Sequence, residues 1–145
     1  MIYFDTSYLV RLYYQDRGAE AVRMLAATDH VASAAHGQAE MMAAFHRKLR
    51  EGAIRPAAYA ALVGQVRAHI DAGAFRWLAQ DQEIFFRIRQ VYQRLPAVFL
   101  RAADAIHLAT AAEAGFRIVY SNDAHLLAGA KHFGVEGKNV IGQAP

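Results

Sequence analysis

The chain of 145 residues contains no cysteine, so disulfide bonds and thiolate metal sites are excluded. It has only three prolines, and it lacks internal repeats and low-complexity tracts, which favours a single domain without a linker. Its uncharged runs fall well short of the roughly 20 residues that a membrane span needs. No basic segment followed by an apolar stretch and a cleavage site opens the chain, so we expect a cytoplasmic protein that does not associate with membranes.

Charged residues are also scarce, at 20% of the chain, whereas 55% of the residues are hydrophobic, enough for a buried core in one domain. The net charge is +3, a sign that suits a polyanionic partner. The basic residues gather in two segments, 47–55 and 87–101. Two interpretations stay open, either solvated helix faces or a surface that binds the backbone of a nucleic acid.

Short apolar runs alternate with amphipathic segments along the whole chain. We predict strands at residues 2–5, 30–33, 75–78, 116–120 and 139–141. Helices are expected at about 7–15, 19–27, 35–50, 56–72, 81–95, 101–114 and 124–132, with Pro96 ending the fifth. Short strands that alternate with helices imply a parallel sheet covered on both faces, so the predicted fold class is α/β of the doubly wound kind.

Four acidic residues occupy positions that a hydrophobic core disfavours. Asp5 follows an apolar run at the start of the chain, and Asp123 comes soon after the apolar run at 118–120. Glu40 and Asp104 lie in predicted helices whose neighbouring residues are mostly small or apolar, and buried acids are rare unless they are paired or bind a metal. Ligands of open α/β sheets bind at the carboxyl ends of the strands, so these acids favour a binding site.

Each acid also has an ordinary structural interpretation. Asp5 and Asp123 can cap the helices that follow them, and Glu40 can lie on the solvent face of an amphipathic helix. Asp104 can pair with Arg101, one helical turn earlier. The sequence alone leaves these alternatives open.

If the four carboxylates converge, their repulsion requires protonation or a counter-ion. Two unit charges about 4 Å apart repel by about 4 kcal/mol at an effective dielectric constant of 20. Oxygen ligands suit Mg²⁺ or Mn²⁺, and such an ion lowers the pKa of bound water and stabilises charge on phosphoryl oxygens. We therefore predict a site for Mg²⁺ or Mn²⁺ at the four acids. Nearby hydroxyls that can hold water or phosphate beside the ion belong to Thr6, Ser7 and Ser121.

The histidines offer a different kind of metal site. In Asp104-x-x-His107 and Asp123-x-His125 the acid and the imidazole can be mixed ligands for iron or zinc. A histidine in a mostly apolar helix is more often a hydrogen-bonded, partly buried residue, and no H-x-x-x-H spacing links the other histidines. The sequence therefore assigns no role to His36, His107 or His125.

Four motifs follow one another in order along the chain. They are Tyr3-Phe4-Asp5-Thr6-Ser7, Ser33 with Glu40 seven positions later, Asp104-Ala-Ile-His-Leu-Ala-Thr-Ala, and Ser121-Asn122-Asp123. In this order they resemble the motifs of the PIN domain family and, within it, of the VapC-type toxins of toxin–antitoxin pairs. Each motif is weak by itself, but together they extend the resemblance over essentially the whole chain.

The resemblance implies one PIN-like domain over residues 1–145, a three-layer α/β/α fold with a short-stranded parallel central sheet. It also implies a Mg²⁺- or Mn²⁺-dependent endoribonuclease, usually a homodimer, that a small antitoxin neutralises by covering the acidic site. Asp5, Glu40, Asp104 and Asp123 carry over as catalytic metal ligands. The basic side chains then expected to bind the RNA backbone are Arg47, Lys48, Arg50, Arg87 and Arg101.

Two other functions are compatible with these residues. A phosphohydrolase of the haloacid dehalogenase type also opens on a strand-end aspartate, but its chemistry needs a second acid two residues on, where this chain has Ser7. A non-catalytic PIN-like module that binds RNA or protein usually lacks one of the acids, and all four are present here. The predicted reaction is therefore hydrolysis of RNA that leaves a 5′-phosphate and a 3′-hydroxyl.

Overall fold

The computed structural model describes residues 1–94 and 99–142. Its strands are β1 Ile2–Phe4, β2 Val31–Ala34, β3 Phe75–Leu78, β4 Ile118–Tyr120 and β5 Glu136–Lys138. In this part of the chain they form one sheet in the order β3-β2-β1-β4-β5, and every neighbouring pair is parallel. Parallel neighbours need crossover connections, and helices supply them here.

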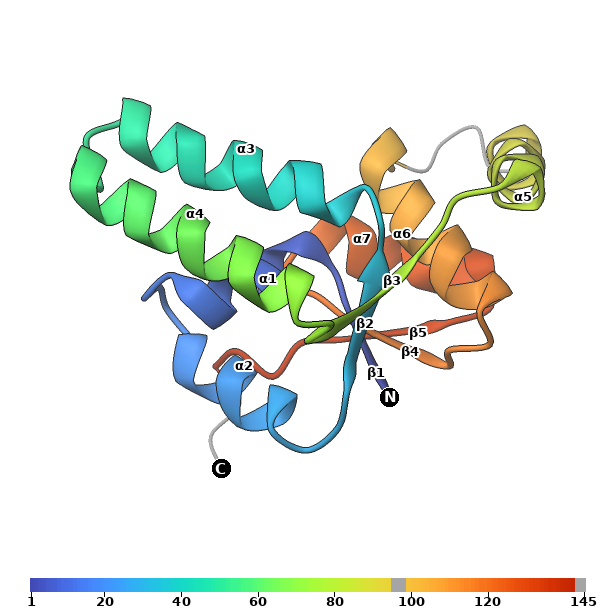
Figure 1. Ribbon diagram of the computed structural model, residues 1–145. Helices are drawn as coiled ribbons and strands as arrows, with labels where there is room; N and C mark the ends of the chain where they lie inside the picture. The colour runs from blue at the N-terminus through green and yellow to red at the C-terminus, as the bar shows by residue number, and fades with distance from the viewer. Residues whose placement is uncertain (95–98, 143–145) are drawn as a thin grey trace.

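The helices cover the sheet on both faces (Figure 1), as the sequence predicted. They are α1 Thr6–Tyr13, α2 Ala19–Ala26, α3 Gly37–Arg50, α4 Pro56–Asp71, α5 Gln82–Arg94, α6 Ala102–Glu113, α7 Ala124–Gly129 and the 3₁₀ helix η1 Ala130–Phe133. The first four lie on one side of the sheet, and α5, α6 and α7 lie on the other. The expected three-layer α/β/α arrangement is confirmed, and within residues 1–94 and 99–142 no helix is long and apolar enough to cross a bilayer.

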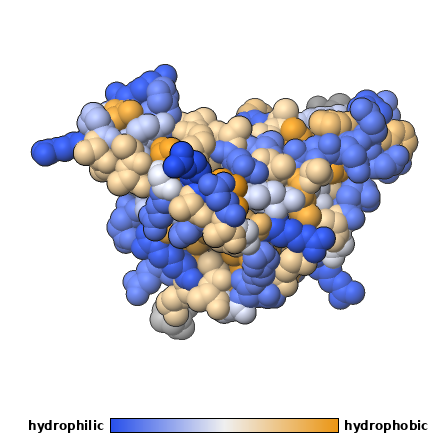
Figure 2. Space-filling view, viewed as in Figure 1, coloured by the Kyte–Doolittle hydropathy of each residue, from blue (hydrophilic) through white to orange (hydrophobic). Residues whose placement is uncertain are grey.

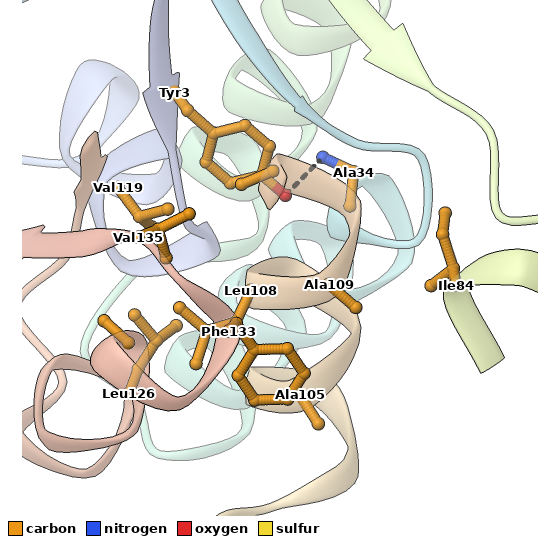
Figure 3. Close-up of a cluster of buried hydrophobic side chains, with 12 residues drawn as sticks. Tyr3, Ala34, Ile84, Ala105, Leu108, Ala109, Val119, Leu126, Phe133 and Val135 are labelled. Carbon is orange, nitrogen blue, oxygen red and sulfur yellow. Dashed lines mark hydrogen bonds between the residues drawn. The ribbon is translucent and has the colours of Figure 1, made fainter. Parts of the chain in front are cut away.

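Successive residues of β1 pack into two different cores, because side chains alternate between the faces of a strand. Tyr3 lies with Leu108, Leu126 and Phe133 in the core under α6 and α7, part of which Figure 3 shows. Its hydroxyl accepts a hydrogen bond from the backbone N–H of Ala34, at 3.1 Å, which ties β1 to the end of β2. A buried phenol is thus satisfied by the neighbouring strand.

Phe4, the next residue, faces the second core. This core lies under α1, α2, α3 and α4, and Phe4 packs there with Tyr8, Val22, Met41 and Phe45. Tyr3 and Phe4 are both fully buried, as expected for a parallel sheet with helices on both faces. The carboxyl end of β1, where Asp5 follows, is therefore fixed from both sides.

The strand order places the ends of β1 and β4 together. The chain runs outward from β1 through β2 to β3, then returns to place β4 on the other side of β1. Such a reversal leaves a crevice at the carboxyl ends of the two central strands, where open α/β sheets bind their ligands. Asp5 and Asp123 follow β1 and β4 and so lie at this crevice.

The prediction of a last strand at 139–141 was wrong, because β5 lies three residues earlier. Glu136, Gly137 and Lys138 have little intrinsic preference for a strand, but they pair with β4. Asn139 instead accepts a hydrogen bond from the Tyr8 hydroxyl, at 2.9 Å, and Ile141 packs beside Gly18. The apolar residues that suggested a strand thus cover α1 and α2.

The remaining differences concern element ends. The helix predicted at 124–132 is an α-helix only to Gly129 and continues as η1 to Phe133. The helix predicted at 81–95 is observed at Gln82–Arg94, and the stop assigned to Pro96 lies outside the described residues. The other elements begin and end within a few residues of the predicted positions.

Candidate metal centre

The four predicted acids, from distant parts of the chain, line one pocket of about 350 Å³. Asp5 and Asp123 are the N-caps of α1 and α7, and Glu40 and Asp104 lie in the first turns of α3 and α6. The capping alternatives are therefore realised together with the convergence. Four helix N-termini border the pocket, and their dipoles stabilise negative charge there, either on carboxylates or on a phosphate.

Asp5 is the most deeply buried of the four acids, with 4% of its surface exposed. Its Oδ2 accepts a hydrogen bond from Ser121 Oγ at 2.6 Å, and its Oδ1 accepts from Ser7 Oγ at 2.7 Å. Burial raises the pKa of Asp5, although His107 and the two hydroxyls act in the opposite direction. The ionised form is thus disfavoured without a cation, and a bound cation would stabilise it.

Asp104 and Asp123 share a counter-ion from the chain itself. Arg101 donates to Asp104 Oδ2 through Nε at 2.9 Å, and its Nη2 donates to Asp123 Oδ2. Burial acts to raise the pKa of Asp123, but hydrogen bonds from the N–H groups of His125 and Leu126 and the charge of Arg101 lower it. The alternative that Asp104 pairs with Arg101 is realised, and the same arginine reaches a second acid.

Glu40 is held by a separate group of side chains. Thr6 Oγ1 donates to its Oε2 at 2.6 Å, and His107 Nε2 lies 3.1 Å from the same oxygen. His36 Nε2 is also near, at 3.3 Å, although this contact lacks hydrogen-bond geometry. Burial acts to raise the pKa of Glu40, but His107, His36 and Thr6 together hold it well below its usual value. Glu40 is therefore an anion at neutral pH.

The three predicted hydroxyls do not all contact the acids in the same way. Ser7 and Ser121 bind Asp5 and also accept backbone N–H groups, those of Asn122 and Asp123 respectively, at 2.9 Å each. They therefore link the end of β1 to the end of β4. Thr6 binds Glu40 instead, and so links α1 to α3.

This set of groups fits a hard divalent cation. Carboxylate oxygens line the pocket, hydroxyls orient one of them, and the buried Asp5 carboxylate lacks a basic side chain bonded to it in the described part of the chain. Mg²⁺ and Mn²⁺ prefer such oxygen ligands and usually retain water. Asp5, Asp104 and Asp123, with Glu40 beside them, are the residues that would hold the ion.

The predicted basic residues divide into two groups. Arg47, Lys48 and Arg101 line the pocket, whereas Arg50 and Arg87 do not. Arg87, on α5, instead forms an ion pair with Glu113 on α6. Figure 2 shows hydrophilic residues gathered at the outer end of the α3–α4 hairpin, the end that includes segment 50–55.

Sequence reasoning missed the imidazoles beside Glu40 and the basic side chain of Arg11, which also lines the pocket. His36 lies four residues before Glu40, a spacing that puts both on one helix face. That spacing was a usable signal. No pattern in the sequence could bring His107 to them, because it belongs to a helix 67 residues from Glu40.

The fold and this pocket define a class of protein. The sequence profile described as "PIN domain" matches residues 2–131, so the chain belongs to the PIN domain family. A comparison with curated protein sequences found no match.

Several solved structures share this fold. FitAcB from Neisseria gonorrhoeae is 21% identical with a TM-score of 0.74, over 96% of this chain and 97% of that chain. VapBC2 from Rickettsia felis, bound to a promoter DNA fragment, is 13% identical with a TM-score of 0.64, over 96% and 98%. VapC20 from Mycobacterium tuberculosis, described as a toxin that cleaves the sarcin–ricin loop, is 20% identical with a TM-score of 0.62, over 88% and 94%. The resemblance found in the sequence is thus confirmed at the level of the fold.

Proposed function

We propose that the chain is a Mg²⁺- or Mn²⁺-dependent endoribonuclease and the toxin of a type II toxin–antitoxin pair. The observation that carries the proposal is the meeting of Asp5, Glu40, Asp104 and Asp123 in one pocket at the strand reversal. Membership of the PIN domain family and the toxin described as cleaving the sarcin–ricin loop support it.

The roles follow from the positions of the side chains. Asp5, Asp104 and Asp123 would hold the ion, and Glu40 would complete the acidic pocket. A divalent ion bound there would supply a water of lowered pKa and would offset negative charge on the phosphoryl oxygens and the departing oxygen. Arg47 and Lys48, on the pocket wall, bind the phosphodiester backbone. The 2′-hydroxyl is not the nucleophile in such a hydrolysis, so the products carry a 5′-phosphate and a 3′-hydroxyl.

The proposed partners are a small antitoxin and a second copy of this chain, in the cytoplasm. A structural neighbour described as a toxin–antitoxin complex from Klebsiella pneumoniae supports the proposal of an antitoxin partner. The neighbours VapBC2 and FitAcB also support it. Four large side chains exposed to solvent support a protein interface on or next to α5: Phe85, Phe86, Tyr92 and Phe99.

The test is cleavage of RNA by the purified chain with Mg²⁺, with EDTA, and with Mg²⁺ restored. We expect cleavage only when free Mg²⁺ is present, and end-group analysis should find 5′-phosphates. Asp104→Asn should abolish cleavage, whereas Asp71→Asn, an exposed acid at the end of α4 that does not line the pocket, should cleave like the wild type. Cleavage that persists in EDTA, or in Asp104→Asn, contradicts the proposal.

A second candidate function is RNA binding without catalysis. The contact of Arg101 with both Asp104 and Asp123 favours it, because it neutralises two acids without a metal. Retention of RNA by the wild type without any cleavage, in the presence of Mg²⁺ or Mn²⁺, would support this second candidate over the first.

A further inference from the structure

Beside the acidic pocket, three side chains direct ligand atoms to one point. Nε2 of His36 and Nε2 of His107 lie 3.3 Å and 3.1 Å from the same Oε2 of Glu40. All three ligand atoms lie within 4.8 Å of one another, and the centroids of the two imidazole rings are 4.4 Å apart. Two imidazoles and a carboxylate thus form a compact set of nitrogen and oxygen donors.

The ring of His36 makes no hydrogen bond in the described part of the chain. Its side chain is only 20% exposed, and both ring nitrogens are buried without a hydrogen-bond partner within residues 1–94 and 99–142. Burial of a polar group that makes no hydrogen bond costs free energy. A bound cation would give His36 Nε2 the partner that it lacks.

His107 is already oriented for such a role. Its side chain is 3% exposed, and its Nδ1 lies 3.0 Å from the hydroxyl of Tyr3. A hydroxyl can either donate or accept, so Tyr3 holds the ring with Nε2 toward Glu40 whichever nitrogen carries the proton. Metal-binding histidines generally have their second nitrogen fixed in this manner.

The backbone of α3 is also close enough to bring His36 and Glu40 against His107. Gly37 separates His36 from the rest of the helix, and a Cβ at Gly37 would lie 3.5 Å from His107 Cε1 and 3.4 Å from Thr6 Oγ1. Both distances correspond to ordinary van der Waals contact, so α3 packs closely against α1 and α6 at Gly37.

The two separations that involve Glu40 Oε2 agree with coordination by one ion, and the ligand atoms of the two histidines lie within 4.8 Å of each other. Bonds of about 2.0–2.1 Å to zinc place neighbouring ligands about 3.4 Å apart in a tetrahedron and about 2.9 Å apart in an octahedron. The observed separations of 3.1 Å and 3.3 Å lie between these values. Imidazole ligands suit Zn²⁺, Co²⁺ or Ni²⁺, whereas Mg²⁺ prefers oxygen alone.

We propose that His36, Glu40 and His107 form a second metal site, selective for Zn²⁺ and related transition metals, next to the pocket for Mg²⁺. The proposal goes beyond the proposed nuclease function, which requires neither histidine. Because Glu40 belongs to both sites, an ion held by the histidines fixes this carboxylate independently of the Mg²⁺ ligands on α1, α6 and α7.

The test uses Co²⁺ as a spectroscopic probe of the full chain in excess Mg²⁺. The wild type should bind one equivalent of Co²⁺ with visible d–d absorption, and Zn²⁺ should displace it. His36→Ala should weaken binding at least about 10-fold. His46→Ala, an exposed histidine on the same helix, is the matched control and should bind like the wild type. His107→Gln should also lose the absorption, with its folding checked by circular dichroism.

Asp104→Asn distinguishes the two metal sites, since it should lose RNA cleavage and keep the Co²⁺ spectrum. Three outcomes overturn the second site: no Co²⁺ or Zn²⁺ uptake by the wild type, unchanged uptake by His36→Ala, or loss of uptake in Asp104→Asn. Any of these would mean that Glu40 and His107 form a hydrogen-bonded pair only, whether or not the chain cleaves RNA.

Discussion

At the scale of single residues, the surroundings of Asp5 favour the binding of a cation but do not stabilise the fold. Its carboxylate is buried, and burial raises its pKa. A group whose folded pKa is raised makes the ionised folded state less stable as the pH rises above its unfolded pKa. The serines at its two oxygens compensate only in part.

Without metal, Asp5→Asn should therefore be at least as stable as the wild type, with a free energy of unfolding up to about 2 kcal/mol higher. Other functional sites trade stability for activity in the same way. The variant should lose Mg²⁺-dependent cleavage. Chemical denaturation in EDTA and an RNA cleavage assay measure the two effects. A large loss of stability would mean that Asp5 serves mainly as the N-cap of α1.

Arg101 occupies the position of a competing cation between Asp104 and Asp123. Its side chain is 54% exposed, and partly exposed ion pairs contribute at most about 1 kcal/mol. Arg101→Ala should therefore bind Mg²⁺ up to about 5-fold more tightly in the absence of RNA, as measured by calorimetry. Arg87→Ala, which removes an arginine outside the pocket, should leave the affinity unchanged. Weaker Mg²⁺ binding by Arg101→Ala would show that the arginine supports the site instead.

At the scale of elements, the approach of α3 to α1 and α6 brings Glu40 to the pocket. Gly37 begins α3, and an added Cβ would meet Ser33 Oγ at 3.3 Å, closer than an ordinary contact. Gly64, inside α4, has open space around the same position. Substituting alanine at each glycine therefore distinguishes the effect of packing, at Gly37, from the effect of helix propensity, at Gly64.

Gly37→Ala should lower the free energy of unfolding by about 1 kcal/mol, because the added methyl crowds the Ser33 hydroxyl, which a hydrogen bond to the Phe4 carbonyl holds in β2. Gly64→Ala should raise it by about 0.5–1 kcal/mol, since alanine is the better helix former. Thermal unfolding monitored by circular dichroism measures both. Equal shifts of Tm in the two variants would show that α3 does not depend on a close approach at Gly37.

At the scale of the whole molecule, the charge is not spread evenly around the pocket. Arg47 and Lys48 lie on its wall, whereas Arg50 and Arg55 belong to the same segment but lie outside it. For single-stranded RNA, the logarithm of the affinity falls by about 0.7 per tenfold increase in salt for each phosphate that is neutralised. We therefore expect Arg47 and Lys48, on the pocket wall, to contribute more to the salt dependence of RNA affinity than Arg50 and Arg55, which lie outside the pocket.

The double variant Arg47→Ala/Lys48→Ala should reduce the slope of log affinity against log salt concentration by about 1.4. The matched double variant Arg50→Ala/Arg55→Ala removes the same charge and should change the slope much less. Fluorescence anisotropy over a series of salt concentrations, with the catalytically inactive Asp104→Asn background, measures both. Equal effects would mean that RNA binding depends on net charge and not on the pocket.

Much of this molecule is determined locally and could be predicted from the sequence. The apolar run before Asp5 specifies β1, Pro56 begins α4, and Gly115 follows the end of α6. Carboxylates are rare in apolar segments, so the sequence alone identified the four acids as candidate site residues. Spacing along one helix would also have joined His36 to Glu40.

The remaining features depend on contacts between distant segments, and only the tertiary structure decided them. Glu136–Lys138 is a strand because β4 offers it a hydrogen-bonded edge, and no local preference predicts that. Arg101 reaches Asp123 across 22 residues, and His107 meets Glu40 across 67. The sequence by itself determined the acidic residues, whereas packing of helices on the two faces of the sheet decided that an arginine pairs with two of them and that two histidines lie beside Glu40.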